Sequence, residues 1–92
     1  MSVKEKLYLV ENLFDSSKIE KAKTRDGYGK GLIEAGEANP NVVVLCADLS
    51  ESTRSLWFEE RFPERFIQCG VAEQGMAAIA SGMAAAGKVA FI

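Results

Sequence analysis

A strand, a turn and a helix of small residues follow one another in residues 65–86, RFIQCGVAEQGMAAIASGMAAA. Residues 66–69, FIQC, predict a short buried strand, and Gly70 predicts the turn after it. The helix that follows has few bulky side chains and carries no charge between Glu73 and Lys88. We therefore expect this helix to be buried on most sides and approached closely by other backbone.

Glu73 is expected near the first turn of this helix, just beyond the carboxyl end of the strand. Open α/β sheets bind their ligands at that edge, and the unpaired N–H groups and dipole of a helix create positive potential there. A carboxylate in this position serves a ligand, or it simply suits the helix dipole. The position alone does not decide between the two interpretations.

The rest of the chain predicts the layers around this unit. Residues 42–47, VVVLCA, form a continuous rather than an alternating apolar run, which is typical of a strand covered on both faces in a parallel sheet. A helix is expected between Thr24 and Asn39, a short helix after residue 53, and a third strand at 88–92. The order strand, helix, strand, helix, strand predicts a three-layer α/β fold with a mostly parallel sheet.

The helix expected after Thr24 contains glycine at positions 27, 29, 31 and 36. Each of these glycines weakens a helix by up to ~1 kcal/mol relative to alanine. We therefore expect packing to hold this helix, with close backbone approach as the reason for the glycines.

The length of the chain, 92 residues, allows one small domain at most, since domains commonly have ~100–150 residues. We expect residues 24–92 to be a partial domain and residues 1–23 to be an N-terminal extension or linker. The apolar spacing over residues 4–14 is compatible with a short helix or with a strand. Because the chain ends within the apparent last strand, we also expect a fragment or a shortened subunit.

Composition argues against several classes of function. A formal net charge of -2 and a pI near 5.1 argue against nucleic acid or an acidic membrane surface as a partner. The chain has no histidine, so a zinc site or a Ser-His or Cys-His nucleophile lacks its central residue. Cys46 and Cys69 are expected to be free, buried thiols of a cytoplasmic protein. No apolar run reaches the ~20 residues that a membrane span needs.

Polar side chains are expected to gather at the carboxyl edge of the sheet. They are Asp48 and Ser52 from a polar loop at 48–52, Glu73, and Arg25 from the start of the first helix. An acid at the end of a strand binds a ribose hydroxyl, holds a metal or caps the loop. The sequence has neither G-x-G-x-x-G nor G-x-x-x-x-G-K-[ST], so a dinucleotide or P-loop phosphate site lacks its glycine cradle.

Three segments together resemble the pyrimidine-binding domain of transketolases: TRDGYGKGLIEAG at 24–36, NVVVLCADLSEST at 41–53, and FPERFIQCGVAEQGMAAIASGMAAAGKVAF at 62–91. The combination of FPERF, GVAEQ and the small-residue helix is the most specific part of this resemblance. Deoxyxylulose-phosphate synthase and the β subunit of 2-oxoacid dehydrogenases share a related domain. The DGYGKG and ADLSEST segments favour a transketolase, in particular the C-terminal subunit of the split form.

The resemblance implies thiamine diphosphate as the cofactor and a transferase of the pentose phosphate pathway that moves a two-carbon ketol unit between sugar phosphates. Glu73 matches the catalytic glutamate that hydrogen-bonds the aminopyrimidine ring and promotes its imino tautomer. Asp48 matches an aspartate beside the cofactor at the dimer interface. Arg25 and Ser52 match the arginine and serine that hold the sugar phosphate.

The resemblance also implies a partner. The Gly-Asp-Gly…Asn metal motif of the family and its catalytic histidines are not found in this sequence. The Mg²⁺ or Ca²⁺ ion and the diphosphate are therefore expected on a separate chain or a missing domain, within a homodimer or heterotetramer, and this chain is expected to provide no metal ligand and to be inactive alone. Two alternatives stay open. One is a fragment of deoxyxylulose-phosphate synthase or of a 2-oxoacid dehydrogenase β subunit, and the other is a non-catalytic α/β interaction domain.

Overall fold

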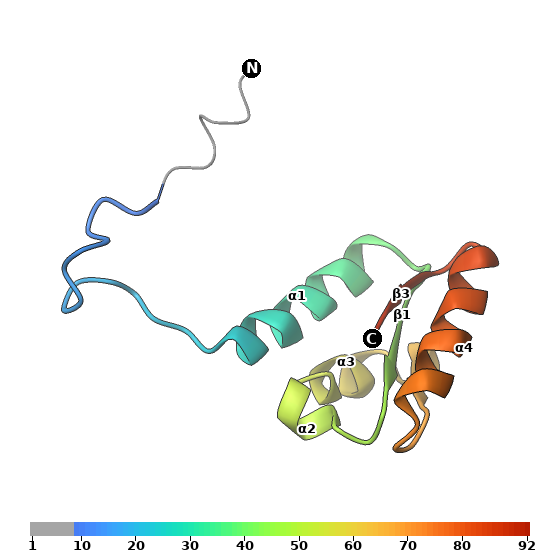
Figure 1. The fold of residues 1–92 in the computed structure, drawn as a ribbon. Coiled ribbons are helices and arrows are strands. Elements are labelled where there is room, and N and C mark those ends of the chain that lie inside the picture. Colours follow the sequence, from blue (N-terminus) through green and yellow to red (C-terminus); the bar gives the residue numbers. More distant parts are fainter. Residues whose placement is uncertain (1–8) are drawn as a thin grey trace.

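The computed structural model describes residues 9–92 and shows a parallel sheet of three strands with helices on both faces (Figure 1). In chain order the elements are α1 (Thr24–Ala38), β1 (Val42–Cys46), α2 (Ser50–Thr53), α3 (Leu56–Arg61), the 3₁₀ turn η2 (Pro63–Arg65), β2 (Phe66–Gln68), α4 (Glu73–Ala85) and β3 (Val89–Phe91). This architecture confirms the predicted α/β class and the parallel sheet.

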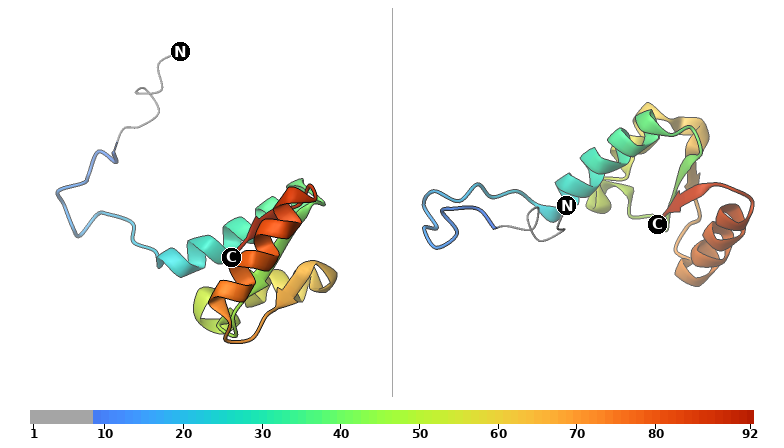
Figure 2. Two further views of the ribbon diagram at one scale, coloured as in Figure 1. Left: turned by 45° about the vertical axis from the view of Figure 1, so that its right-hand side comes forward. Right: turned by 90° about the horizontal axis from the view of Figure 1, so that it is seen from above.

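The central strand of the sheet is β1, with β2 on one side and β3 on the other. Val44 lies opposite Phe66 in β2, and Val42 lies opposite Val89 in β3. The chain crosses from β1 to β2 through α2 and α3 on one face, and from β2 to β3 through α4 on the other (Figures 1 and 2). The first crossover leads from the central strand to one edge of the sheet, and the second leads from that edge to the other. Two crossovers of the same handedness that run in opposite directions place their helices on opposite faces of the sheet. Every residue of β1 is therefore buried, as its continuous apolar sequence predicts.

One face of the sheet is covered by α1 and α3, which approach each other closely. A Cβ atom at Gly36 would lie 2.7 Å from a ring carbon of Phe58 and 2.7 Å from one of Phe62. A Cβ atom at Gly29 would overlap the indole of Trp57. The other two glycines of α1 face open space. The predicted close approach thus explains two of the helix glycines and not the others.

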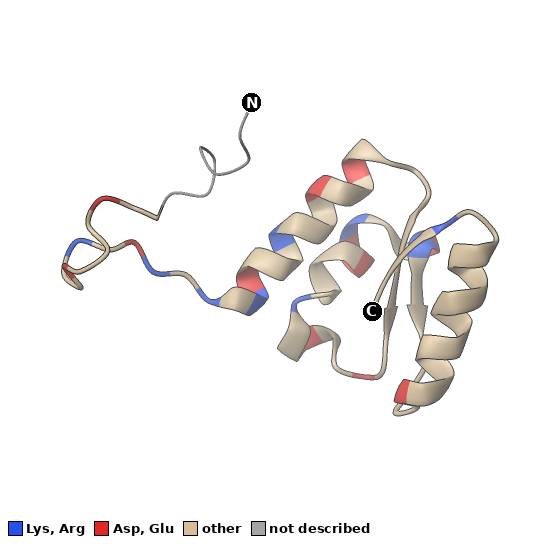
Figure 3. Ribbon diagram, turned by 45° about the horizontal axis from the view of Figure 1, so that its top comes forward, with Lys and Arg blue, Asp and Glu red and all other residues tan. Residues whose placement is uncertain are grey.

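The opposite face is covered by α4 with much less contact. Ala80 is the one residue of α4 that is buried in the described chain, where it packs with Val43 and Leu45. Ile79 stays 48% exposed, and Figure 3 shows that α4 is uncharged beyond its amino end. The expectation of a helix buried on most sides is wrong for this chain, because α4 packs mainly on β3 and β1.

Arg65 ties the amino edge of the sheet to the end of α1. Its guanidinium donates hydrogen bonds to the backbone carbonyls of Gly36 at 2.9 Å, Asn39 at 3.1 Å and Val42 at 3.4 Å. The same group lies 4.0 Å from the ring centroid of Phe62. Because α1 has no basic residue in its own last turn, Arg65 supplies the positive charge that the carboxyl end of a helix favours.

The segment before α1 contains turns but no helix or strand in residues 9–23. Neither the helix nor the strand considered for residues 4–14 is formed in the described part of that range, and the remainder lies outside the described residues. Within residues 9–92, no helix combines the length and the apolar character needed to cross a membrane.

Candidate functional site

The carboxyl ends of β1 and β2 meet at one edge of the sheet, where the backbone N–H of Cys69 donates to the carbonyl of Cys46 at 2.8 Å. Beyond this bond both segments turn through left-handed residues, Asp48 with φ 60° and Gly70 with φ 69°. The N–H groups of both residues donate to the side-chain oxygen Oε1 of Gln68, at 2.7 Å and 3.1 Å. One side chain therefore joins the loop after β1 to the turn that leads into α4.

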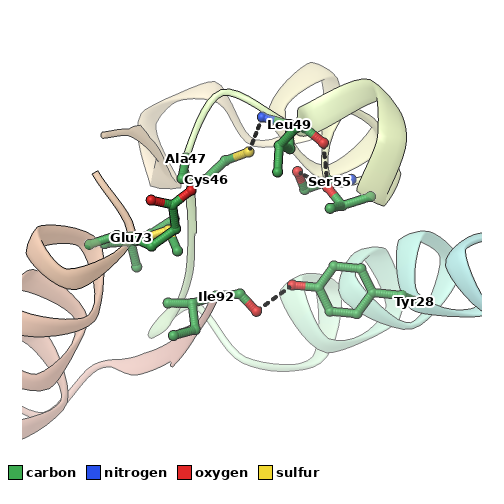
Figure 4. Close-up of a pocket in the computed structure, with 10 residues that line it drawn as sticks. Tyr28, Cys46, Ala47, Leu49, Ser55, Glu73 and Ile92 are labelled. Atoms are coloured by element: carbon green, nitrogen blue, oxygen red, sulfur yellow. Dashed lines mark hydrogen bonds between the residues drawn. The ribbon is translucent and has the colours of Figure 1, made fainter. Parts of the chain in front are cut away.

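Glu73 is the first residue of α4, as predicted, and its side chain is exposed. It lies at the rim of a cavity of about 120 Å³ whose walls include Leu45, Leu49 and Met76. Figure 4 shows Glu73 on one side of this cavity and Tyr28, from α1, on the other. Among the described residues that line the cavity, Glu73 is the one with an acidic or basic side chain. The other described side chains around this hollow carry no formal charge.

Tyr28 closes the cavity from the side of α1. Its hydroxyl donates to the backbone carbonyl of Ile92 at 3.4 Å (Figure 4), and burial of the ring raises the pKa of this phenol. The Tyr28 hydroxyl therefore stays protonated and uncharged over a wide pH range.

Asp48 and Ser52 lie together in a second, polar hollow of about 300 Å³, which Leu49 also lines. The expectation of a loop over 48–52 is correct only in part, because α2 begins at Ser50. Thr53 explains the helical turn, since its backbone N–H and its hydroxyl both donate to the carbonyl of Leu49, at 3.0 Å and 2.9 Å. The structure therefore places Asp48 and Ser52 beside the cavity that Glu73 lines, because Leu49 lines both hollows.

Arg25 is exposed in the first turn of α1 and lines neither hollow. Its neighbour Asp26 accepts a hydrogen bond from Nε of Arg54 at 2.9 Å, and this bond lowers the pKa of the Asp26 carboxyl. The start of α1 is thereby held against the segment between α2 and α3. The structure does not bring the Arg25 side chain together with the other candidate residues.

Sequence reasoning missed Gln68 and Tyr28 as parts of this edge. The one sequence signal for Gln68 is its polar side chain at the end of a strand of apolar residues. That signal does not predict that Gln68 accepts hydrogen bonds from the backbone of two different loops. Cys46 was expected to be a buried free thiol, and it is free and buried; its Sγ also accepts the N–H of Leu49 at 3.2 Å. Cys69 is free but only half-buried.

Several known proteins are similar to this chain in sequence or in fold. The transketolase pyrimidine-binding domain family matches residues 20–92. A putative transketolase C-terminal section of Methanocaldococcus jannaschii is 54% identical over 67 residues, which cover 73% of this chain and 21% of that protein. The transketolase of Homo sapiens is 42% identical over 65 residues, covering 71% of this chain and 10% of the relative. The 1-deoxy-D-xylulose-5-phosphate synthase of Dictyoglomus thermophilum is 40% identical over 72 residues, covering 74% and 12%.

A solved structure of a split-gene transketolase, in an inactive β4 tetramer, is similar with a TM-score of 0.65 and 50% sequence identity. The match covers 74% of this chain and 23% of that one. The chain thus spans only between 10% and 23% of the length of these four proteins.

Proposed function

Because this chain belongs to the family of the transketolase pyrimidine-binding domain, we propose that it supplies the pyrimidine-binding half of a thiamine diphosphate site in a cytoplasmic transketolase. The complete enzyme transfers a two-carbon ketol unit between sugar phosphates of the pentose phosphate pathway. The observation that carries the proposal is the carboxyl group of Glu73 at the rim of a cavity whose other described side chains carry no formal charge.

The residues of the cavity fit a small flat heterocycle. The volume of the cavity is about 120 Å³, somewhat below the ~150 Å³ of an apolar cavity that holds benzene, so part of the ring would extend toward the partner that closes the site. In the proposal, Leu45, Leu49 and Met76 exclude water from the ring, and the Glu73 carboxyl shares a proton with a ring nitrogen. Closure by a partner would strengthen this hydrogen bond, because water would no longer compete for the carboxylate. Thiamine diphosphate, when bound, supplies the carbanion chemistry, while this chain binds and orients its pyrimidine.

The polar hollow next to this cavity carries the remaining assignments. We assign Asp48 as a contact of the cofactor and Ser52 as a contact of the sugar phosphate, because both side chains line this hollow. Arg25 is assigned to the sugar phosphate as well, since a guanidinium binds phosphate oxygens in a fork. We also take residues 24–92 as the partial domain, because α1 begins at Thr24, with residues 1–23 as its extension.

A partner completes the proposed site. Within residues 9–92, no three acidic or thiol side chains gather where they could hold a metal ion. We assign the Mg²⁺ or Ca²⁺ ion and the diphosphate to a diphosphate-binding subunit or domain, in a homodimer or heterotetramer. The support comes from two relatives, one described as a transketolase C-terminal section and the other as a split-gene transketolase. The isolated chain is then inactive.

The test replaces Glu73 in the reconstituted complex of this chain with the diphosphate-binding subunit of the same organism. Glu73→Gln should lower kcat for ketol transfer by about 100-fold or more, because a positioned acid–base group contributes about that much. Glu64→Gln is the matched control, since Glu64 is an exposed carboxylate in η2 at the opposite edge of the sheet, and it should leave the rate unchanged.

Two other functions predict different results. A deoxyxylulose-phosphate synthase, favoured by the relative from Dictyoglomus thermophilum, would consume pyruvate instead of transferring a ketol unit. A non-catalytic interaction domain, favoured by the exposed face of α4, would leave turnover of the complex unaffected by Glu73→Gln. Unchanged turnover would therefore refute the proposed role of Glu73.

A further inference from the structure

We infer that Gln68 is a positioning residue that holds both loops of the candidate cofactor site in place, an inference that rests on the function proposed above. Gln68 is the last residue of β2. Its Oε1 accepts the backbone N–H of Asp48 at 2.7 Å and that of Gly70 at 3.1 Å. The first loop carries a proposed cofactor contact, and the second leads directly to Glu73.

The need for such a residue follows from where the strand ladder ends. Cys46 pairs with Gln68 in the register of β1 and β2, and the N–H of Cys69 still reaches the carbonyl of Cys46. Beyond this bond Asp48 and Gly70 adopt left-handed conformations, and their N–H groups donate to the Gln68 side chain instead of to a strand carbonyl. The side-chain oxygen of Gln68 thus supplies an acceptor for two N–H groups that lie beyond the end of the ladder.

Asp48 depends on this contact more than Gly70 does. A left-handed backbone is uncommon for a residue with a side chain, whereas glycine adopts it without a steric penalty. The hydrogen bond that the Asp48 N–H donates to Gln68 therefore selects a conformation that the Asp48 loop would otherwise populate less. Because one oxygen accepts both bonds, a movement of the Gln68 side chain displaces the Asp48 loop and the entrance to α4 together.

Three variants separate positioning from general stability. Gln68→Met keeps the length of the side chain and removes the acceptor, while Gln68→Glu keeps an acceptor oxygen. Asn39→Leu is the matched control, because Asn39 Oδ1 accepts the N–H of Asn41 at 2.9 Å, which is the same kind of bond at the opposite edge of the sheet.

The first readout is amide hydrogen exchange in the full chain, which does not depend on catalysis. Gln68→Met should speed exchange at the N–H groups of Asp48 and Gly70 by about three- to tenfold, the equivalent of one net hydrogen bond. Gln68→Glu should restore the original rates, and Asn39→Leu should not alter them. Unchanged exchange in Gln68→Met would overturn the inference.

The second readout is thiamine diphosphate in the reconstituted complex. Gln68→Met should raise the KM for the cofactor by about tenfold and change kcat at saturation much less. Displaced loops would weaken the binding of the cofactor, whereas the complex that does form would still react. An equal rise in Asn39→Leu, or an unchanged KM, would reduce Gln68 to a purely structural role and overturn the inference. Failure of the proposed function is seen separately, as full turnover in Glu73→Gln, while the exchange rates still report on Gln68.

Discussion

The two faces of the sheet share one central strand but are packed in opposite ways. β1 sends Val42 and Val44 to the face of α1 and α3, and Val43 and Leu45 to the face of α4. On the first face Phe58 is fully buried, whereas α4 buries only Ala80 in the described chain. The strand is the same, so the difference comes from the helices. The stability of the described chain is therefore concentrated in the layer of α1 and α3.

The sharpest test of this contrast removes one large side chain from each face. Phe58→Ala should lower the free energy of unfolding by about 3–5 kcal/mol, because it removes a fully buried ring and leaves a cavity. Ile79→Ala on α4 should cost less than about 1 kcal/mol, since Ile79 is 48% exposed. Urea unfolding of the full chain, followed by circular dichroism, gives both values. Losses of similar size would show that the two faces stabilise the chain equally.

A smaller effect, with opposite signs on the two faces, is expected from two glycines. Gly36→Ala should destabilise the chain by about 1–3 kcal/mol, because the added methyl group overpacks the contact with Phe58 and Phe62. Gly82→Ala in α4 should stabilise it by up to about 1 kcal/mol, since a Cβ there meets nothing within 4 Å. Thermal unfolding of the two variants provides the measurement. A higher melting temperature for Gly36→Ala would contradict the close packing of α1 on α3.

The smallest effect is expected at the ion pair that holds the start of α1. The hydrogen bond from Arg54 lowers the pKa of Asp26 below its usual value of 3.8, so the native state favours the ionised carboxylate. This stability is present above pH 3.8 and is lost as the pH falls through the lower native pKa. Asp26→Asn should therefore be slightly less stable than the original chain at neutral pH and equally stable in strong acid. The difference is small because ion pairs near the surface of a protein contribute little.

Urea titrations of both proteins across this pH range, at low and at high salt, measure that difference. Added salt should reduce it at neutral pH, since salt screens exposed charges. A difference that persists unchanged in acid would show that the Asp26 carboxylate is not its source.

The sequence predicted the elements that local pattern determines and missed what depends on contacts between them. The apolar run of β1 and the position of Glu73 at the start of α4 follow from periodicity and from the glycine turn. The burial of α4 cannot be predicted in this way, because small side chains show only that another element could approach the helix closely. Whether another element lies against it depends on the number of layers in the chain.

The same limit applies within the candidate site. The resemblance to the transketolase pyrimidine-binding domain was based on residues 24–36, 41–53 and 62–91. The family match over residues 20–92 confirms that interpretation. The bridge made by Gln68 needs two left-handed residues from different loops, which no local pattern encodes. The placement of Arg25 apart from both hollows likewise depends on how α1 lies across the sheet. The roles assigned to Glu73, Asp48, Ser52 and Arg25 remain predictions.

The contact of Arg65 with the end of α1 affects the order in which the elements of the chain fold. Its guanidinium serves the carbonyl of Gly36, from which it is separated by 29 positions, and α1 has no basic residue of its own in that turn. During synthesis the residues of α1 are joined before Arg65 is added, so the nascent segment lacks this counter-charge and contains several glycines. We expect α1 to be completed only after β2 has been made and has aligned with β1.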